Sequence, residues 1–461
     1  MAGYLGDRFG IKTVFVGGLA LFVVGSFLCG IAPTLPILIL ARAIQGIGGG
    51  LALPLGPALI YPVFPPQEQG RAFGIFGIAL VTAPALGPIL GGALVDVGLW
   101  RWIFFINIPI GLLGIYLSLR WLKTAQGNSK LPLDWLGLIF STVGFGSVLY
   151  AATRAADFGW GSSEVVTFFV IGTVALIIFA VIELFVAKVP LLDLRLFQSP
   201  VFTSAAFVGW VSVMALFGAE FLLPLYLQVL RGYSAFETGL LVLPLAIASG
   251  IVTPIAGQLY DKIGPRPIVV TGFLLLVVNT WQLAQIQIDT PLSWLIVLLA
   301  IRGLALGLTI QTTFTAALST IPVNQVSRGS GLINSTRQVI QAIAVAVLAT
   351  VLASQVSPGV QAEMDQLQTQ MATFQTNLPA GTEAPALCEI PASTLPIPAT
   401  VKGTIGQFCN EYIVGLEQAY TLTFYFAIAA VFLGLLLPGW PATWVGRRAA
   451  PQEGPPVAAG H

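Results

Sequence analysis

GYLGDRFGIK at residues 3–12 and GQLYDKIGPR at residues 257–266 are two copies of one pattern. They match at six positions, which are Gly3/Gly257, Leu5/Leu259, Asp7/Asp261, Arg8/Lys262, Gly10/Gly264 and Lys12/Arg266. Each copy precedes a segment that carries an arginine, and a second arginine then opens the next segment: Arg42 and Arg71 in the first case, Arg302 and Arg328 in the second. Three landmarks in register indicate an internal repeat, and hence a chain built from two parallel halves.

Composition places the chain in a lipid bilayer. Of its 461 residues 56% are hydrophobic and only 8% are charged, and the mean hydropathy is +0.90. Soluble domains hold about 25% charged residues, so this inventory cannot cover a water-facing surface. Apolar runs long enough to cross a bilayer, about 20 residues, must satisfy their own backbone groups, which helices do. We therefore expect an all-α polytopic membrane protein with twelve spans, near residues 13–32, 36–61, 70–95, 102–122, 134–153, 164–187, 199–230, 236–259, 267–287, 292–319, 329–355 and 418–440.

The same inventory excludes several classes of function. The formal net charge is +1 and the sequence has no basic cluster, which argues against nucleic-acid binding. The single histidine is His461 and the cysteines number three, so we expect neither a zinc or haem site nor a histidine-dependent triad. Because no catalytic constellation is present, we expect no enzyme, no metal and no cofactor.

Lysines and arginines set the expected orientation. If the loop at Asp7 is cytoplasmic, 13 of the 20 basic residues lie inside and only Arg101, Arg154, Arg231 and Lys402 lie outside. Basic residues concentrate on the cytoplasmic side of membrane proteins. The bias therefore predicts a multi-pass protein of the cell (inner) membrane with a cytoplasmic C-terminus.

The spans and the repeat divide the chain into four parts. These are an N-terminal bundle at 1–125, a central helix pair at 126–198, a C-terminal bundle at 199–445 and a cytoplasmic tail at 446–461. Two spans precede the second copy of the motif and none precedes the first. By its own symmetry we expect the chain to lack its first two helices, roughly 58 residues.

The C-terminal bundle includes one long exterior loop, residues 357–417. Its apolar residues over 364–378 follow helical spacing, which predicts a short amphipathic helix. A solvated loop is the favoured interpretation, and a docking device is the alternative. Because the loop faces an oxidising compartment, we expect a disulfide between Cys388 and Cys409, with Cys29 in the core.

Four ordered motifs resemble the major facilitator superfamily, and most closely its fourteen-helix drug:proton antiporter branch. GYLGDRFGIK is similar to the superfamily's cytoplasmic-loop motif, and RAIQGIGGG at 42–50 resembles its R-x-x-Q-G motif. GIFGIALVTAPALGPILGG at 74–92 resembles the antiporter motif, with Ala83 where a third glycine usually stands, and WRWIFFINIPIG at 100–111 resembles the segment that follows. The likeness covers nearly the whole chain. It implies a major facilitator fold of two pseudo-symmetric helical bundles, with twelve spans present of an expected fourteen.

The cytoplasmic-loop motif suggests a latch. Its residues are Gly3, Asp7, Arg8 and Gly10 in the first copy and Gly257, Asp261, Lys262 and Gly264 in the second. Each carboxylate can cap the N-terminus of a neighbouring helix, and a cation can pair with it. Such a latch would hold the two halves together on the cytoplasmic side and release during the conformational cycle. In the alternative, the basic residues merely anchor the topology.

Arg42 lies in an otherwise uncharged span, where a guanidinium should face the bundle or a water-filled cavity. The resemblance implies a role in proton coupling, with Gln45 beside it. The alternative is that Arg42 snorkels to the outer interface.

Glu220 is the only acid well inside any expected span, which makes it a candidate proton carrier. A hydrogen-bonded structural role and an outward-facing vestibule with Gln228 are the alternatives.

Arg337 and Asn334, with Gln338 and Gln341, lie on one helix side and are expected to line a cavity opposite Glu220, or else to bond between helices. Aromatic and weakly polar residues could form a further wall or simply pack: Trp210, Phe207, Trp281 and Asn279.

The antiporter motif predicts a hinge with a small-residue face, formed by Gly74, Gly87, Pro88, Gly91 and Gly92. Glycines four residues apart, such as Gly87 and Gly91, allow close helix approach, and Pro88 bends a helix. We expect these residues to be mechanical and to make no contact with a ligand.

Together these features predict a proton-coupled secondary transporter that exports amphipathic or cationic drugs, or other organic compounds, by alternating access. It would use the proton gradient as driving force. Its partners would be the lipid bilayer, a small organic substrate, and a periplasmic adaptor with an outer-membrane channel, with no nucleic acid. An exporter of an endogenous metabolite, peptide or lipid, and a truncated membrane protein without transport, are the alternatives.

Overall fold

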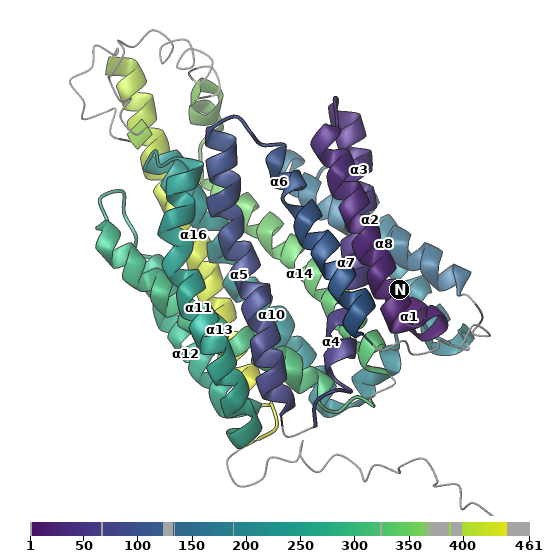
Figure 1. Ribbon diagram of the computed structural model, residues 1–461. Helices are drawn as coiled ribbons and strands as arrows, with labels where there is room; N and C mark the ends of the chain where they lie inside the picture. Colours follow the sequence, from purple (N-terminus) through teal and green to yellow (C-terminus); the bar gives the residue numbers. More distant parts are fainter. Residues whose placement is uncertain are drawn as a thin grey trace, which may run out of the picture.

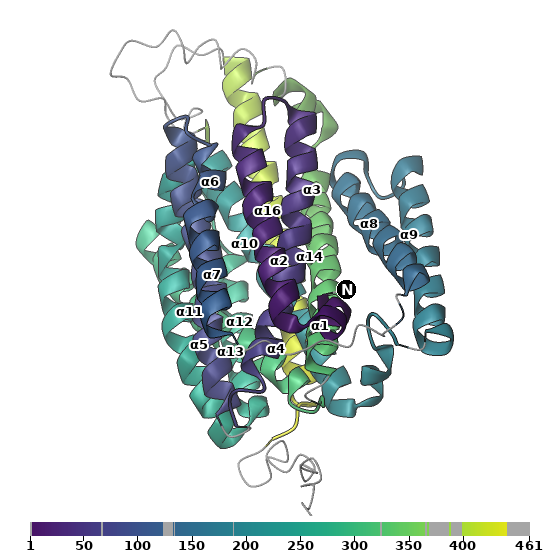
Figure 2. The ribbon, with the colours of Figure 1, turned by 45° about the vertical axis from the view of Figure 1, so that its right-hand side comes forward.

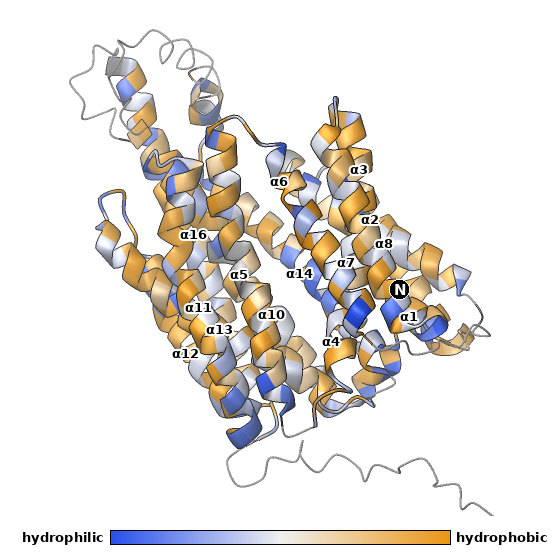
Figure 3. Ribbon diagram, viewed as in Figure 1, coloured by the Kyte–Doolittle hydropathy of each residue, from blue (hydrophilic) through white to orange (hydrophobic). Residues whose placement is uncertain are grey.

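The computed structural model is a bundle of long helices that run side by side (Figure 1). It describes residues 2–65, 68–122, 134–187, 189–322, 325–364 and 399–439, together with residues 132, 367, 387 and 388. Eleven helices in these ranges are long and apolar enough to cross a membrane. α5 (Gln69–Asp96) adds a helix at the remaining expected span. Apolar residues follow the helices along most of their length, as a lipid-facing bundle requires (Figure 3).

The N-terminal bundle is formed by helices that follow one another along the chain. It comprises α1 (Ala2–Phe9), α2 (Ile11–Ile31), α3 (Leu35–Ala52), α4 (Leu55–Ile60), α5, α6 (Trp102–Phe105) and α7 (Asn107–Trp121). Within it α2 packs against both α3 and α7, whereas α5 packs mainly against α11 (Ala235–Ile263) of the other half. The seam between the halves therefore runs along α5 and α11, which lie side by side in the two ribbon views (Figures 1 and 2).

The C-terminal bundle holds the larger hydrophobic core. Its helices are α10 (Pro200–Leu225), continued by η3 (Tyr226–Leu230), α11, α12 (Pro265–Leu283), α13 (Leu292–Leu318), α14 (Val326–Gln355) and α16 (Ala399–Gly434). The central pair, α8 (Trp135–Phe158) and α9 (Ser163–Val181) with η1 (Ile182–Val186), stands at the edge of the molecule (Figure 2). α8 packs against α14, and η2 (Leu194–Gln198) leads into α10.

The last glycine of each motif copy explains why the helix breaks there. Gly10 separates α1 from α2 with φ 89°, and Gly264 separates α11 from α12 with φ 80°. This backbone region is strained for residues that carry a Cβ, so glycine is the residue that fits. The repeat is thus present in local backbone geometry as well as in sequence.

The exterior loop is shorter than the sequence predicts. We expected a loop over 357–417 and a span from 418, but α16 is already helical from Ala399. A helix that emerges from the bilayer into water can continue without apolar residues, so hydropathy alone does not mark its start. Residues 358–364 are also helical, whereas most of the expected amphipathic helix at 364–378 and the tail at 446–461 lie outside the described residues.

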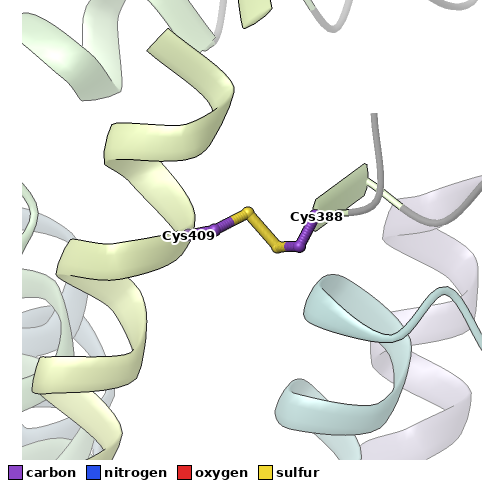
Figure 4. Close-up of a disulfide and its surroundings, with 2 residues drawn as sticks. All are labelled: Cys388 and Cys409. Atoms are coloured by element: carbon purple, nitrogen blue, oxygen red, sulfur yellow. A yellow bond between two sulfur atoms is a disulfide. The ribbon is translucent and has the colours of Figure 1, made fainter. Parts of the chain in front are cut away.

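The expected disulfide is present. Cys388 and Cys409 are bonded, with their Cα atoms 5.9 Å apart, and the bond joins a short described segment to α16 (Figure 4). Cys29 is buried in α2 as expected.

These cysteines lead to a labelling prediction. We expect denatured, unreduced protein to react with one polyethylene-glycol maleimide, at Cys29, and reduced protein to react with three, because the bonded sulfurs do not react with maleimide. Gel mobility measures the number of labels, and Cys29→Ser provides the control with no label before reduction. Three labels on unreduced protein would contradict the disulfide.

Candidate functional site

A carboxylate of the C-terminal half caps a helix of the N-terminal half. Asp261, in the last turn of α11, accepts hydrogen bonds from the backbone N–H groups of Gly70 and Arg71, each at 2.9 Å. These groups belong to the first turn of α5, where backbone donors lack partners within the helix and the helix dipole favours negative charge. Asp261 is only 8% exposed, so few water molecules compete for these bonds.

The repeat counterpart, Asp7, makes the reciprocal contact. Its carboxylate pairs with the Arg328 guanidinium at 2.7 Å and accepts a bond from the Ser327 hydroxyl at 3.4 Å, both in the first turn of α14. Burial raises the pKa of Asp7 above its ordinary value, while the Arg328 charge acts in the opposite direction. The sequence offered Arg8 as the adjacent cation, but the structure places Arg8 over the Phe9 ring. The partner comes from the other half, and sequence spacing carried no signal for that.

We call these two contacts, Asp261 to α5 and Asp7 to α14, the carboxylate latches, and the end of the bundle that holds them the motif end. The first glycine of each motif copy lets the latched helices meet. A Cβ at Gly257 would overlap the Gly70 carbonyl oxygen, and a Cβ at Gly3 would lie 2.7 Å from the Ser327 carbonyl carbon. Both copies of the motif therefore bring backbone into direct contact across the two halves.

The final basic residue of each copy acts within its own bundle. Lys12 donates to the carbonyl oxygens of Leu119 and Leu122 at 2.9 and 2.6 Å, at the C-terminal end of α7. Arg266 donates to the Leu437 carbonyl oxygen at 2.6 Å, just beyond the C-terminus of α16. A cation at a helix C-terminus satisfies unpaired carbonyl groups and the helix dipole. From the sequence alone, we expected these two residues only to anchor the topology.

The antiporter-motif glycines divide into two groups. Gly74 and Gly92 press against α11, since a Cβ at Gly92 would lie 2.5 Å from the carbonyl carbon of Ala235. We expected Gly87 and Gly91 to mediate close helix approach, but a Cβ at Gly87 would meet no atom within 4 Å and a Cβ at Gly91 would meet only the Ile103 side chain, at 4.0 Å. Both line a cavity together with Pro88 and Gly92. Part of this motif thus lines a cavity, while the expectation that it makes no contact with a ligand stays a prediction. A spacing of four cannot tell which side of α5 faces α11.

The cavity has a volume of about 740 Å³ and lies between α5 and helices α10, α11, α13 and α14. Most of its wall is apolar, and its charged lining residues are Glu220, Arg302 and Arg337. The polar face of α14 expected from the sequence is present there, since Asn334, Gln338 and Gln341 also line it, and Gln228 joins them. The structure thus brings Glu220, Arg337 and Asn334 together, while their part in proton coupling stays a prediction.

The two cavity arginines differ in how they are held. Arg302 is 1% exposed, and its Nη2 donates to the carbonyl oxygens of Ala215 and Leu216 at 3.0 and 2.6 Å. Its Nη1 donates to Asn279 Oδ1 at 3.4 Å. Arg337 makes no hydrogen bond or ion pair with any residue that the structure describes. Acceptors within the protein therefore hold the Arg302 guanidinium in place, whereas the Arg337 guanidinium is available to bind a ligand.

Arg42 and Gln45 lie outside the cavity, although the sequence grouped them with Glu220. Arg42 donates to Gln45 Oε1 at 2.9 Å and stacks over the Phe104 ring at 4.9 Å, and its side chain is exposed. Gln45 donates to Ser26 Oγ at 2.6 Å. This face of α3 turns toward α2 and α6, away from the cavity lining.

The expected aromatic wall is also absent from the cavity lining. Trp210 donates to Thr336 Oγ1 at 3.0 Å and packs on Phe207, with ring centroids 4.9 Å apart. Trp281 is 51% exposed, and Asn279 donates to the Leu298 carbonyl oxygen. Trp210 and Asn279 therefore form hydrogen bonds between helices, whereas Phe207 packs on Trp210 within α10.

Three cavity residues carry buried polar atoms without a hydrogen-bond partner among the described residues, and the sequence indicated a cavity role for none of them. They are Thr238 Oγ1, Arg302 Nε and Gln311 Nε2, on residues that are 2%, 1% and 6% exposed. A single Thr or Gln in a span has no spacing pattern and is commonly satisfied within its own helix, so the sequence gives no signal for them.

Comparison with known proteins agrees with this architecture. The family model described as Major Facilitator Superfamily matches residues 1–345. The uncharacterized MFS-type transporter YhcA of Bacillus subtilis is 36% identical over 351 residues, which cover 76% of this chain and 66% of YhcA. The lincomycin resistance protein LmrB of Listeria monocytogenes is 32% identical over 346 residues, covering 75% of this chain and 72% of LmrB. The chain therefore corresponds to only part of the length of these relatives.

A solved structure supports the fold. The human organic anion transporter MFSD10 (TETRAN) superposes with a TM-score of 0.53 at 15% identity, over 92% of this chain and 79% of that chain. At this identity the likeness concerns the helical architecture alone. The family model and the bacterial relatives establish that the chain belongs to the major facilitator superfamily.

Proposed function

We propose that this protein is a proton-coupled secondary transporter of the cell (inner) membrane, which exports amphipathic organic compounds, including cationic ones, by alternating access. The observation that carries the proposal is the position of Glu220. Among the residues that the structure describes, it is the only acidic side chain lining the cavity, and its carboxylate makes no hydrogen bond or ion pair with any of them. An acid in such surroundings can exchange a proton for the positive charge of a substrate.

The two latches support alternating access with a defined order of steps. They tie the halves together at the motif end, while the cavity reaches Val95 and Ala235 at the opposite end of the seam. With the excess of basic residues placed inside, the motif end faces the cytoplasm. In this conformation a substrate leaves outward and Glu220 takes a proton from outside. Release of the latches then opens the cavity to the cytoplasm, where the proton departs.

The relatives support the choice of substrate. LmrB is named for resistance to lincomycin, and it is 32% identical to this chain over 75% of the chain's length. The largely apolar wall of the cavity suits compounds that partition into membranes.

Transport in inverted membrane vesicles tests the proposal. We expect uptake of a fluorescent amphipathic cation when the vesicle interior is acidified, and loss of that uptake when a protonophore collapses the gradient. Vesicles without the protein provide the control. Uptake that persists unchanged after the gradient has collapsed would contradict proton coupling, and absence of uptake under a measured gradient would contradict transport.

A further inference from the structure

We propose that the cavity recognises an acidic group on its substrate through Arg337, so that the preferred compounds are amphoteric: an apolar body with both a cationic group and a carboxylate. This inference rests on the proposed function and specifies its substrate class. Arg337, Glu220 and Gln311 are the residues that carry it.

The first step concerns the free guanidinium. Arg302 is already engaged by two backbone carbonyls and Asn279, whereas Arg337 lines the same cavity with no protein acceptor among the described residues. A guanidinium presents five N–H donors in a planar fork that matches a carboxylate in a bidentate arrangement. Arg337 is therefore a recognition group, and Arg302 a structural one.

The second step concerns the unpaired donors. Gln311 Nε2 and Arg302 Nε can only donate, and both are buried at the cavity without a partner. A buried donor that stays unpaired destabilises the protein unless a ligand or water accepts from it. The polar lining thus has a surplus of donors, which favours a ligand rich in acceptor oxygens.

The third step concerns charge. Two guanidinium groups face one carboxylate in the lining, and both attract the Glu220 charge without forming an ion pair within 4.0 Å. A compound with only a positive charge would meet a net positive wall in a medium of low dielectric constant. A compound that also carries a carboxylate places its cation toward Glu220 and its acid toward Arg337. Protonation of Glu220 still removes the partner of the cation, so exchange with a proton is retained.

Rhodamine B and its ethyl ester provide a matched pair of probes, because they share the apolar ring and the cation and differ only in the free carboxylate. We expect the purified full-length chain to bind the acid about tenfold or more tightly than the ester, by fluorescence anisotropy. Arg337→Gln should bring the ratio of the two dissociation constants close to one, and Arg337→Lys should retain part of the preference because it keeps the charge. Arg154→Gln, in α8 and paired with Glu164, provides the arginine control.

Gln311→Leu serves as a second variant, since it removes an unpaired donor without breaking a protein hydrogen bond. It should lower the preference for the acid as well. Equal binding of acid and ester by the natural sequence would overturn the inference, as would an Arg337→Gln variant that weakens both dyes by the same factor. If the proposed function is wrong but this inference is right, the results differ from these. Purified protein would still bind the acid more tightly than the ester, but vesicles would transport neither dye in response to a pH gradient.

Discussion

Replacing Glu220 by glutamine is expected to abolish dye transport driven by a pH gradient, to the level of vesicles that lack the protein. Glutamine preserves the shape of the side chain but cannot bind and release a proton near neutral pH. No other acidic residue in the described part of the chain lines the cavity to take over this role. Affinity for a cationic dye should also fall by about tenfold, the loss expected when one charge-assisted contact disappears.

The structure offers a close control for this substitution. Glu164 lies at the start of α9, where its carboxylate accepts from Tyr150 and pairs with Arg154 away from the cavity. Glu164→Gln should therefore transport the dye like the natural sequence. A variant that has lost only proton coupling should still elute as a monodisperse species and should still exchange dye across the membrane without a pH gradient. A variant that has lost its fold should do neither. If Glu220→Gln still concentrates the dye against its gradient under a pH difference, Glu220 is not the proton carrier.

The pH dependence of dye binding provides a second test of Glu220 as the proton carrier. In the natural sequence a cationic dye and a proton compete for Glu220, so dye affinity should fall as the pH decreases. Glutamine removes that competition, so the affinity of the variant should not vary with pH over the range in which Glu220 titrates. A pH dependence that survives the substitution would assign the titration to another group.

Much of the fold could be predicted because the bilayer makes the sequence pattern simple. The expected spans are all helical in the described residues, since an apolar run in lipid has few alternatives to a helix. Hydropathy does not predict that α16 begins at Ala399, because a segment that lies in water can form either a helix or a loop. The disulfide followed from the expected compartment and needed no knowledge of the fold.

The site was harder to predict, because its contacts join distant parts of the chain. The spacing of Asn334, Arg337 and Gln341 predicts one polar helix face, and the structure places that face at the cavity. In contrast, Arg42 and Arg302 occupy matching places in the repeat and yet have different surroundings. Arg302 is buried because α10 supplies two carbonyl acceptors, and a local sequence cannot show whether such a neighbour exists.

Replacing Asp261 by alanine is expected to raise the cytoplasmic accessibility of the cavity by about tenfold. The substitution leaves the Gly70 and Arg71 backbone donors of α5 without their acceptor, and the loss of a helix cap of this kind costs about 0.5–2 kcal/mol. That cost falls on the latched conformation alone, because only there do α5 and Asp261 meet. A difference of about 1.4 kcal/mol shifts a two-state equilibrium tenfold.

Labelling of a Gln311→Cys variant with a membrane-impermeant maleimide in inverted vesicles measures this accessibility. Cys29 is buried and the other two cysteines are bonded, so the background is low. Asp96→Ala is the matched control, because Asp96 caps α11 from the opposite end of the same seam through a longer, exposed bond of 3.3 Å to the Phe236 N–H. It should not raise labelling from the cytoplasmic side. An unchanged labelling rate in Asp261→Ala would mean that the Asp7 latch and the glycine contacts between α5 and α11 hold the halves together without Asp261, and that the Asp261 carboxylate does not control opening.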